Sequence, residues 1–134
     1  MSESLIIIDT SVIREGKLED LKTAMNALVA FAEENEPRMI AYQVYLNEDE
    51  TRVTVIQVHP DPVSAEFHMN LAGPAFSKFA ELIQMLEIDV YGRPNSDLLE
   101  RLQCKARLLG QARLVVHSLS AGFTRLGVPG PVIR

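Results

Sequence analysis

The sequence predicts a single α+β domain, and three observations lead to that prediction. The chain has 134 residues, of which 47% are hydrophobic and 23% are charged, a balance typical of one folded domain with a modest core. Short segments rich in isoleucine and valine alternate with longer segments whose apolar residues recur at helical spacing. Turn-forming residues, mainly Pro, Gly, Asn and Asp, separate these segments.

The first half of the chain predicts a strand, a helix and a hairpin. Residues 5–13 are rich in isoleucine and valine and predict a strand. Residues 18–34 carry apolar side chains at helical spacing and predict an amphipathic helix, which Pro37 brings to an end. Residues 39–46 and 52–59 then form the two strands of a hairpin around a polar turn.

The next segments complete a recognisable order of elements. Residues 64–71 predict a short helix capped by Asp61, residues 76–83 carry a second helical stripe, and residues 86–91 predict a fourth strand. The order β-α-β-β-α-β is that of ferredoxin-like folds. With both helices on one face of the sheet, its other apolar face needs a partner, so we expect a homodimer.

The last third of the chain is an extension of this arrangement. Residues 95–109 predict a capped helix, residues 112–123 have strand character, and residues 128–134 are expected to form a loose tail. We expect one domain in all, with a ferredoxin-like core over residues 4–92 and a helix-strand extension over residues 93–134. The extension is expected to pack on the core or to swap onto a partner.

Charge and composition exclude several classes of protein. The formal net charge of −5 disfavours nucleic acid as a partner, because phosphate binding needs clustered positive charge. The one basic cluster, Arg101, Lys105, Arg107 and Arg113, is expected to be a solvated face. No apolar run approaches the roughly 20 residues that span a bilayer, and the N-terminus has no signal pattern, so we expect a cytoplasmic protein. The single cysteine, Cys104, is expected to be buried or half-buried in a helix.

Two segments resemble a known family. Residues 33–45 (EENEPRMIAYQVY) are similar to a family segment in which a helix ends at Glu-Pro-Gly-Cys and a Tyr-x-x-Tyr strand follows. Residues 53–68, with a strand, a short turn and a histidine on a helix, are similar to the family segment Glu-x-Trp-x-Asp followed by a helix bearing His. The family is that of antibiotic biosynthesis monooxygenase-like domains, within the dimeric α/β barrel superfamily, and the resemblance covers residues 4–92.

The resemblance implies a pocket between the helices and the sheet. In relatives such a pocket serves cofactor-independent oxidation of aromatic or quinol-type substrates, or haem. The chain departs from the family pattern at several positions: Gln57 and His59 stand where Glu and Trp are usual, and Arg38 replaces a glycine. Haem-degrading relatives have an asparagine at the position of Asp9 and a tryptophan at that of His59, so haem degradation is not expected here.

Three polar residues interrupt otherwise apolar segments and are the catalytic candidates: Asp9, His59 and His68. A histidine near a carboxylate can move a proton near neutral pH. Oxygenation of a phenol or hydroquinone needs a base that forms the anion and an apolar cavity. The candidates for contact with a substrate are Tyr42, Gln57, Phe67 and Phe76.

Each candidate also has a purely structural alternative. His59 would then be a polar residue at a strand end, His68 a hydrogen-bonded helix residue, and Asp9 a satisfied strand residue or part of an interface. The spacing contains no H-x-H or H-x-x-x-H pattern, so we expect no metal and no cofactor. Two functions stay open: a cofactor-free monooxygenase acting on a small aromatic or quinol-type compound, and a non-catalytic dimeric module that binds a small hydrophobic ligand or has a structural role.

Overall fold

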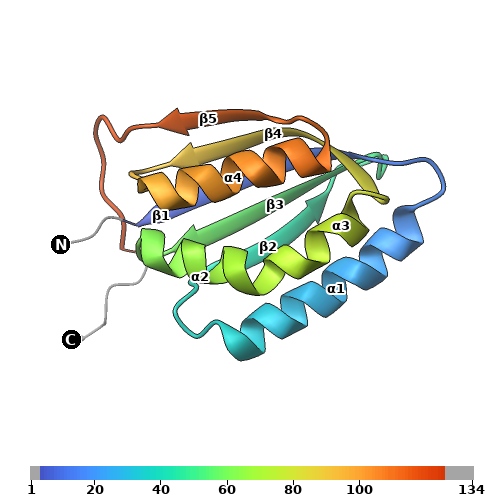
Figure 1. Cartoon of the computed structure of the whole chain (residues 1–134), viewed down its shortest axis with the longest axis horizontal. Coiled ribbons are helices and arrows are strands. Elements are labelled where there is room, and N and C mark those ends of the chain that lie inside the picture. The colour runs from blue at the N-terminus through green and yellow to red at the C-terminus, as the bar shows by residue number, and fades with distance from the viewer. Residues whose placement is uncertain (1–3, 126–134) are drawn as a thin grey trace.

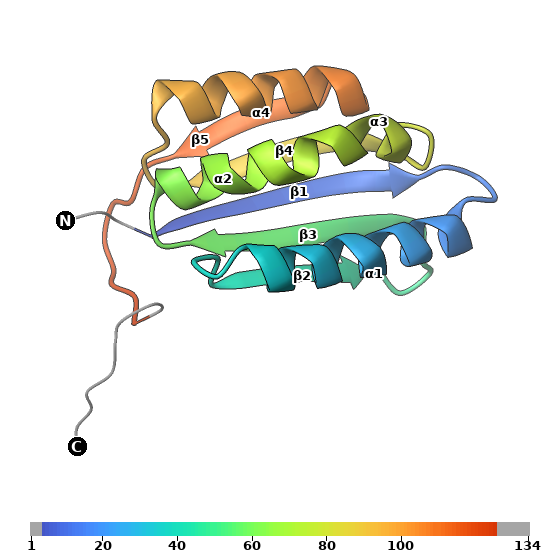
Figure 2. The same cartoon turned by 60° about the horizontal axis from the view of Figure 1, so that its bottom comes forward.

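The computed structural model describes residues 4–125 as one mixed five-stranded sheet with its helices on one face. In Figure 2 all four helices lie in front of the sheet. The strands are β1 (Leu5–Ile13), β2 (Ala41–Leu46), β3 (Arg52–His59), β4 (Ile83–Tyr91) and β5 (Arg113–His117). The helices are α1 (Leu18–Asn35), α2 (Pro62–Ala72), the 3-10 turn η1 (Gly73–Ala75), α3 (Phe76–Phe79) and α4 (Ser96–Leu109).

The sheet has the strand order β2-β3-β1-β4-β5. The first four strands pair antiparallel, and β5 runs parallel to β4 at the edge. The predicted β-α-β-β-α-β ferredoxin-like order is confirmed. The extension completes this sheet, because its strand pairs with β4 of the same chain and its helix packs against β4, α2 and α3.

Strand alternation decides which polar side chains point toward the helices. On β1, Leu5, Ile7, Asp9 and Ser11 are all buried on the side that the helices cover. Within residues 4–125 no helix covers the opposite face of the sheet, where the central strands β1 and β3 carry the half-buried isoleucines Ile6, Ile8 and Ile56.

Capping residues explain where α2 and α4 begin and where α4 ends. The Asp61 carboxylate accepts a hydrogen bond from the Ser64 backbone N–H at 3.0 Å, which confirms the predicted cap. Asn95 caps α4 in the same way, accepting from the Leu98 N–H at 2.8 Å. Gly110 ends α4 with φ of 144°, a conformation that disfavours any side chain.

Some sequence predictions were wrong in detail. The stripe over residues 76–83 predicted one helix, but its last residues, Leu82 and Ile83, turn into the sheet, and β4 begins at Ile83 rather than at residue 86. A short apolar run fits a buried helix and a buried strand equally well. The last strand is shorter than residues 112–123, Cys104 is exposed rather than buried, and residues 128–134 lie outside the described residues.

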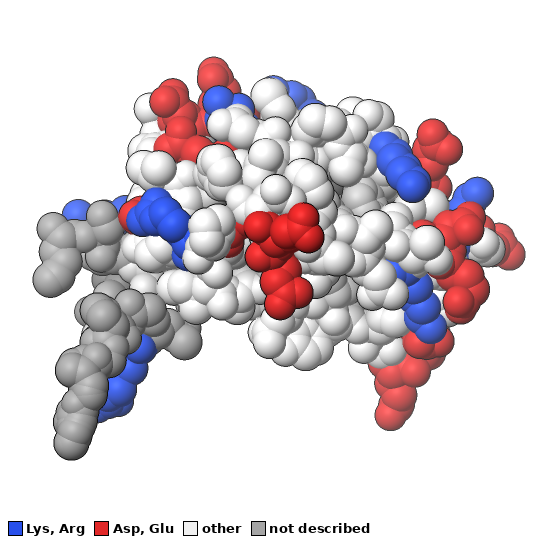
Figure 3. Space-filling view, turned by 90° about the horizontal axis from the view of Figure 1, so that it is seen from below, with Lys and Arg blue, Asp and Glu red and all other residues white. Residues whose placement is uncertain are grey.

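The surface carries both charged groups and exposed apolar side chains. On the face seen from below, an acidic cluster lies near the centre among uncharged side chains, and further acidic and basic side chains gather toward the two ends (Figure 3). Exposed apolar side chains occur on α1 and α2, namely Phe31, Val63 and Phe67. Among the described residues, no helix combines the length and the apolar character needed to cross a membrane.

Candidate functional site

His59 lies at the end of β3 in a buried hydrogen-bond chain. Its Nε2 is 3.0 Å from Oε1 of Gln57, two residues earlier on the same face of the strand, and its Nδ1 is 2.8 Å from Oγ of Ser64 on α2. Because the amide oxygen of Gln57 can only accept, Nε2 of His59 carries the hydrogen. Nδ1 then accepts from the Ser64 hydroxyl, so both ring nitrogens are used.

This environment keeps His59 neutral. Burial, and next the nearby His68, lower the pKa of His59 to about 3, against a weaker opposing effect of the Asp61 charge. The His59 side chain is completely buried. Near neutral pH it therefore neither carries a charge nor exchanges its proton readily, and its role in this cluster is to hold Ser64 and Gln57 in place.

His68 forms a second buried pair with Glu36. Nδ1 of His68 is 2.8 Å from Oε2 of Glu36, and the two side chains are 1% and 2% exposed. Glu36 is the residue directly after α1, where its N–H still bonds to the Ala32 carbonyl and Pro37 stops the helix. The second carboxylate oxygen, Oε1, is buried without a hydrogen-bond partner in the described part of the chain.

The arrangement of this pair fits a proton acceptor. Since a carboxylate only accepts, Nδ1 of His68 donates to Glu36 and the opposite nitrogen, Nε2, is the basic one. No hydrogen bond of Nε2 is found within residues 4–125. A histidine oriented by a buried carboxylate, with its other nitrogen unused, is the usual form of a general base in enzymes.

Tyr42 joins the two histidines in one cluster. Its ring meets the His68 ring edge-on with centroids 4.9 Å apart, and the His59 and His68 centroids are 6.1 Å apart. Burial first, and then the charges of Asp9 and Glu36, raise the pKa of Tyr42 well above its ordinary value. Tyr42 therefore stays protonated, and its hydroxyl can donate a hydrogen bond.

Asp9 faces the same side of the sheet but has a different partner. Its Oδ2 is 3.3 Å from Nζ of Lys105, and the two side chains are 5% and 6% exposed. The expectation that Lys105 belongs to a solvated face was wrong, because it lies on the inner face of α4 next to Leu102 and Ala106. Ser11, two residues after Asp9, is buried with its hydroxyl unpartnered among the described residues.

Two hollows lie in the described part of the chain, and of the clustered residues only Tyr42 lines either of them. One is a groove between α1 and β2 of about 350 Å³, with Tyr42 in its wall beside Met25, Val44 and Val53. The other, of about 500 Å³, is a cleft between α2 and α4 that Phe76 helps to line.

The structure thus places the predicted residues in four settings, one of which is the cleft that Phe76 lines. His59, His68, Tyr42 and Gln57 come together in one buried cluster, whereas Asp9 belongs to an ion pair with α4. Phe67 lines neither of the two hollows, and its side chain is 47% exposed.

Three members of these buried networks were not found from the sequence. Glu36 looked only like the end of a helix, Ser64 like the first turn of one, and Lys105 like a surface residue. Their contacts bring together residues 32, 5 and 96 positions apart. The one usable signal is that Lys105 stands seven residues after Leu98 and three after Leu102, which is the spacing of the buried face of α4.

Comparisons with solved structures show which fold the chain has. No family model matches the chain, and no curated protein matches it. MupZ from Pseudomonas fluorescens has a TM-score of 0.71 at 18% identity, over 97% of this chain and 95% of that one. A Caulobacter crescentus protein proposed to be an antibiotic biosynthesis monooxygenase has a TM-score of 0.61 at 15% identity, over 66% and 88%. SnoaB from Streptomyces nogalater, a cofactor-independent oxygenase, has a TM-score of 0.59 at 12% identity, over 71% and 97%.

The chain has the fold of these proteins. Its structural neighbours include a proposed antibiotic biosynthesis monooxygenase, the class that the sequence resemblance indicated. MupZ spans nearly the whole chain, whereas the other two cover about two thirds of it. An extension beyond the shared core is therefore not peculiar to this chain.

Proposed function

We propose that the protein is a cofactor-independent monooxygenase that acts on a small phenol or quinol-type compound. The observation that carries the proposal is the buried pair of His68 and Glu36, with nitrogen and oxygen 2.8 Å apart. The fold shared with the cofactor-independent oxygenase SnoaB supports the same class of reaction. Fold similarity alone does not determine activity, so the assignment depends on what the side chains can do.

The groove between α1 and β2 is the proposed substrate site. Its volume of about 350 Å³ lies within the roughly 300–1,000 Å³ common for small-molecule pockets. Its lining is mainly leucine, valine and methionine, with Lys22 and Asn26 as further polar members beside Tyr42, so it favours an apolar ring system. Tyr42 forms part of its wall and contacts His68, which is 1% exposed and does not itself line the groove. The Tyr42 hydroxyl has no hydrogen-bond partner among the residues described.

The side chains have distinct roles in the proposed reaction. Nε2 of His68 takes the phenolic proton, and the negative charge of Glu36 stabilises the imidazolium that results. The Tyr42 hydroxyl, which stays protonated, donates a hydrogen bond to the phenolate oxygen. His59 is a positioning residue, because its two nitrogens are engaged by Gln57 and Ser64.

Dioxygen is the oxidant in this scheme. The phenolate gives electrons to O₂ through a ring carbon, a C–O bond forms there, and the C–H bond at that carbon breaks. One oxygen atom stays in the product as a quinone carbonyl and the other leaves as water. A phenol and one O₂ thus yield a quinone and one water, and the substrate itself supplies every electron.

A second candidate function is binding without catalysis. The observation that favours it is the neutral, fully hydrogen-bonded state of His59, at a position where the family pattern has a tryptophan. In this case the groove would hold a small hydrophobic ligand, and the His68 pair would serve only to satisfy buried polar groups.

The active form is proposed to be a homodimer. The sheet face opposite the helices carries half-buried isoleucines on β1 and β3, with Asp89 and Glu87 beside them on β4, and a second copy would cover these isoleucines. An isologous contact between two sheets is the simplest cover for such a face, since twofold dimers are the commonest assembly.

Oxygen uptake tests the catalytic proposal. A panel of naphthols, hydroquinones and polyphenols would be supplied to the protein in an oxygen electrode, with H68Q as the test variant and H117Q as the matched control. The proposal predicts that at least one compound consumes one O₂ per product, and that H68Q alone abolishes the uptake. Saturable binding without oxygen uptake would contradict catalysis and favour the non-catalytic binding module. Oxygen uptake that is unchanged in H68Q would show that His68 is not the base.

A further inference from the structure

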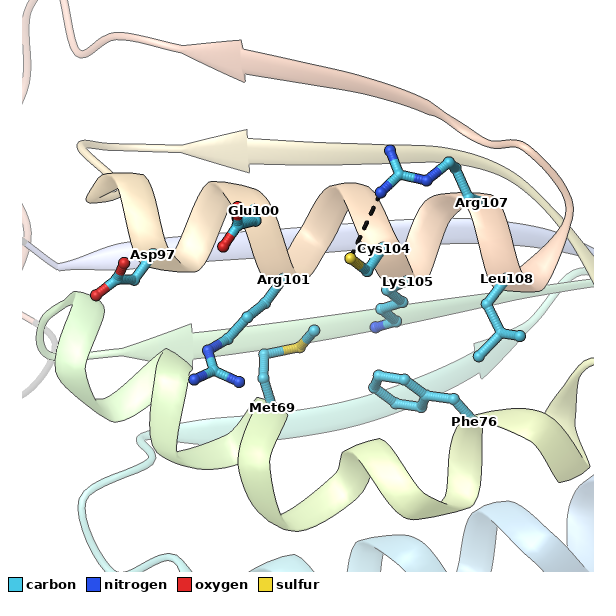
Figure 4. A pocket seen from close by; sticks show the side chains of 9 residues that line it. All are labelled: Met69, Phe76, Asp97, Glu100, Arg101, Cys104, Lys105, Arg107 and Leu108. Carbon is cyan, nitrogen blue, oxygen red and sulfur yellow. Dashed lines mark hydrogen bonds between the residues drawn. The ribbon is translucent and has the colours of Figure 1, made fainter.

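The cleft between α2 and α4 has an unusual composition for a chain of net negative charge. It holds about 500 Å³ and has no lining residue in common with the Tyr42 groove. Met69 and Phe76 form its apolar side, across from α4 (Figure 4). Its charged side chains all come from α4: the cations Arg101, Lys105 and Arg107 and the carboxylates Asp97 and Glu100. Cations therefore outnumber carboxylates in the cleft, while the chain as a whole carries a net charge of −5.

Lys105 lies at the inner end of the cleft with hydrogen-bonding capacity to spare. Its side chain is 6% exposed, and its ammonium group contacts Oδ2 of Asp9 at 3.3 Å and lies 5.2 Å from the centre of the Phe76 ring. An ammonium group has three N–H donors, and Asp9 is its one hydrogen-bond acceptor among the described residues. A buried charge is stable only when its donors are satisfied. We therefore expect a ligand in the cleft to supply a further hydrogen-bond acceptor for the Lys105 ammonium group.

Arg101 lies on the same side of the cleft without a partner. Its side chain reaches from α4 toward Met69 (Figure 4). Asp97 stands four residues before it on the same helix, yet no ion pair or hydrogen bond joins Arg101 to any residue that the structure describes. A guanidinium group has only donors, in a planar fork that fits a carboxylate with two hydrogen bonds.

We propose that this cleft binds an apolar organic molecule that ends in a carboxylate. The carboxylate contacts the Arg101 guanidinium and a free donor of Lys105, and the apolar body lies against Phe76, Met69 and Leu108. The ion pair with Asp9 holds Lys105 in position. The C-terminal extension thereby supplies the cationic half of a second binding site, separate from the one proposed for catalysis.

Binding of a matched acid and amide tests the proposal. The probes are 3-phenylpropionate and 3-phenylpropanamide, which differ in charge but hardly in shape, titrated into the full-length ¹⁵N-labelled protein. The acid is expected to shift backbone resonances of α4 and α2 in a saturable way and to bind at least tenfold more tightly than the amide. Equal affinities, shifts confined to α1 and β2, or no saturable shift would overturn the proposal.

Two variants locate the charge that matters. R101Q is expected to weaken binding of the acid about tenfold and to leave the amide unchanged, because the exposed arginine contributes a charge-assisted bond. R113Q removes the same charge from β5, outside the cleft, and is expected to change the affinity less than twofold. Equal effects of the two variants would show an influence of net charge alone and overturn the proposal.

The buried pair is tested by removing both charges together. K105M alone would leave the Asp9 carboxylate buried without its partner, so the double variant D9N/K105M is used and its fold checked by circular dichroism. A folded double variant is expected to lose at least tenfold in affinity for the acid. An unchanged affinity would show that Lys105 does not bind the carboxylate. If the double variant does not fold, the affinity of R101Q for the acid tests the proposal instead.

Discussion

The neutral state of His59 makes a quantitative prediction about stability and pH. Burial and His68 lower the pKa of His59 to about 3, whereas a histidine in the unfolded chain titrates near 6.5. Between these values the unfolded chain binds one more proton than the folded one. The free energy of unfolding must therefore fall as the pH is lowered, by up to about 1.4 kcal/mol per pH unit from this residue alone.

The expected loss between pH 7.5 and 4.5 is about 2.6 kcal/mol from His59, as the integrated linkage relation gives for these two pKa values. The range stops at pH 4.5 because Asp49 and Asp61 also have lowered pKa values. Their contributions to stability are present above the unfolded pKa near 3.9 and are lost below it. Above pH 4.5 the effect of His59 is separate from theirs.

Urea unfolding followed by circular dichroism measures this loss. The wild type, H59Q and H117Q would each be unfolded at several pH values between 7.5 and 4.5. H59Q should be less stable at neutral pH but should lose about 2.6 kcal/mol less on acidification than the wild type. H117Q, which changes a half-buried histidine paired with Asp89, keeps His59 and should follow the wild type. The same pH dependence in H59Q and the wild type would refute the argument.

Three further predictions concern the fold and the proposed base. G110A should lower the free energy of unfolding by about 2–4 kcal/mol, because a Cβ there would lie 2.8 Å from the Met85 backbone nitrogen at a strained φ; G73A, where nothing lies within 4 Å, should be nearly neutral, and equal melting temperatures would contradict this. I8E should convert the proposed dimer into monomers in light scattering, because it places a charge on the uncovered sheet face; an unchanged mass would show that this face is not the interface. E36Q should keep the fold but slow substrate oxidation about 100-fold, since its histidine partner loses a charged acceptor, and an unchanged rate would exclude the pair from the chemistry.

Much of the fold could be predicted because local signals agreed with the tertiary structure. The strand over residues 5–13 has the predicted bounds, and so does the one over residues 52–59, since β-branched residues fill both faces of a sheet. Asp61 was predicted correctly as a helix cap, and the cap of the later helix was predicted within residues 95–97, where Asn95 supplies it, because a cap depends on a hydrogen bond that spans only three residues. The start of β4 was missed because Leu82 and Ile83 continue the apolar spacing of the helix before them.

The candidate cluster could be predicted only in part, because its contacts are long-range. The shared face of Gln57 and His59 follows from strand alternation alone, and the structure places both there. The partner of His68 lies 32 residues away and that of Asp9 lies 96 residues away. No local pattern indicates that a glutamate after a helix or a lysine on a helix will be buried; the packing of the whole chain decides it.

The central claim is that His68, held by Glu36, removes a proton from a phenol bound in the Tyr42 groove. The ionisation of bound 4-nitrophenol tests this most directly, because its phenolate has a visible absorption band and the compound titrates near neutral pH. The bound phenol is expected to ionise about one pH unit below the free compound, since a positive charge on His68 stabilises the phenolate, and H68Q should abolish that shift. Failure to bind, or a bound phenol that is as hard to ionise as the free one or harder, would contradict the claim.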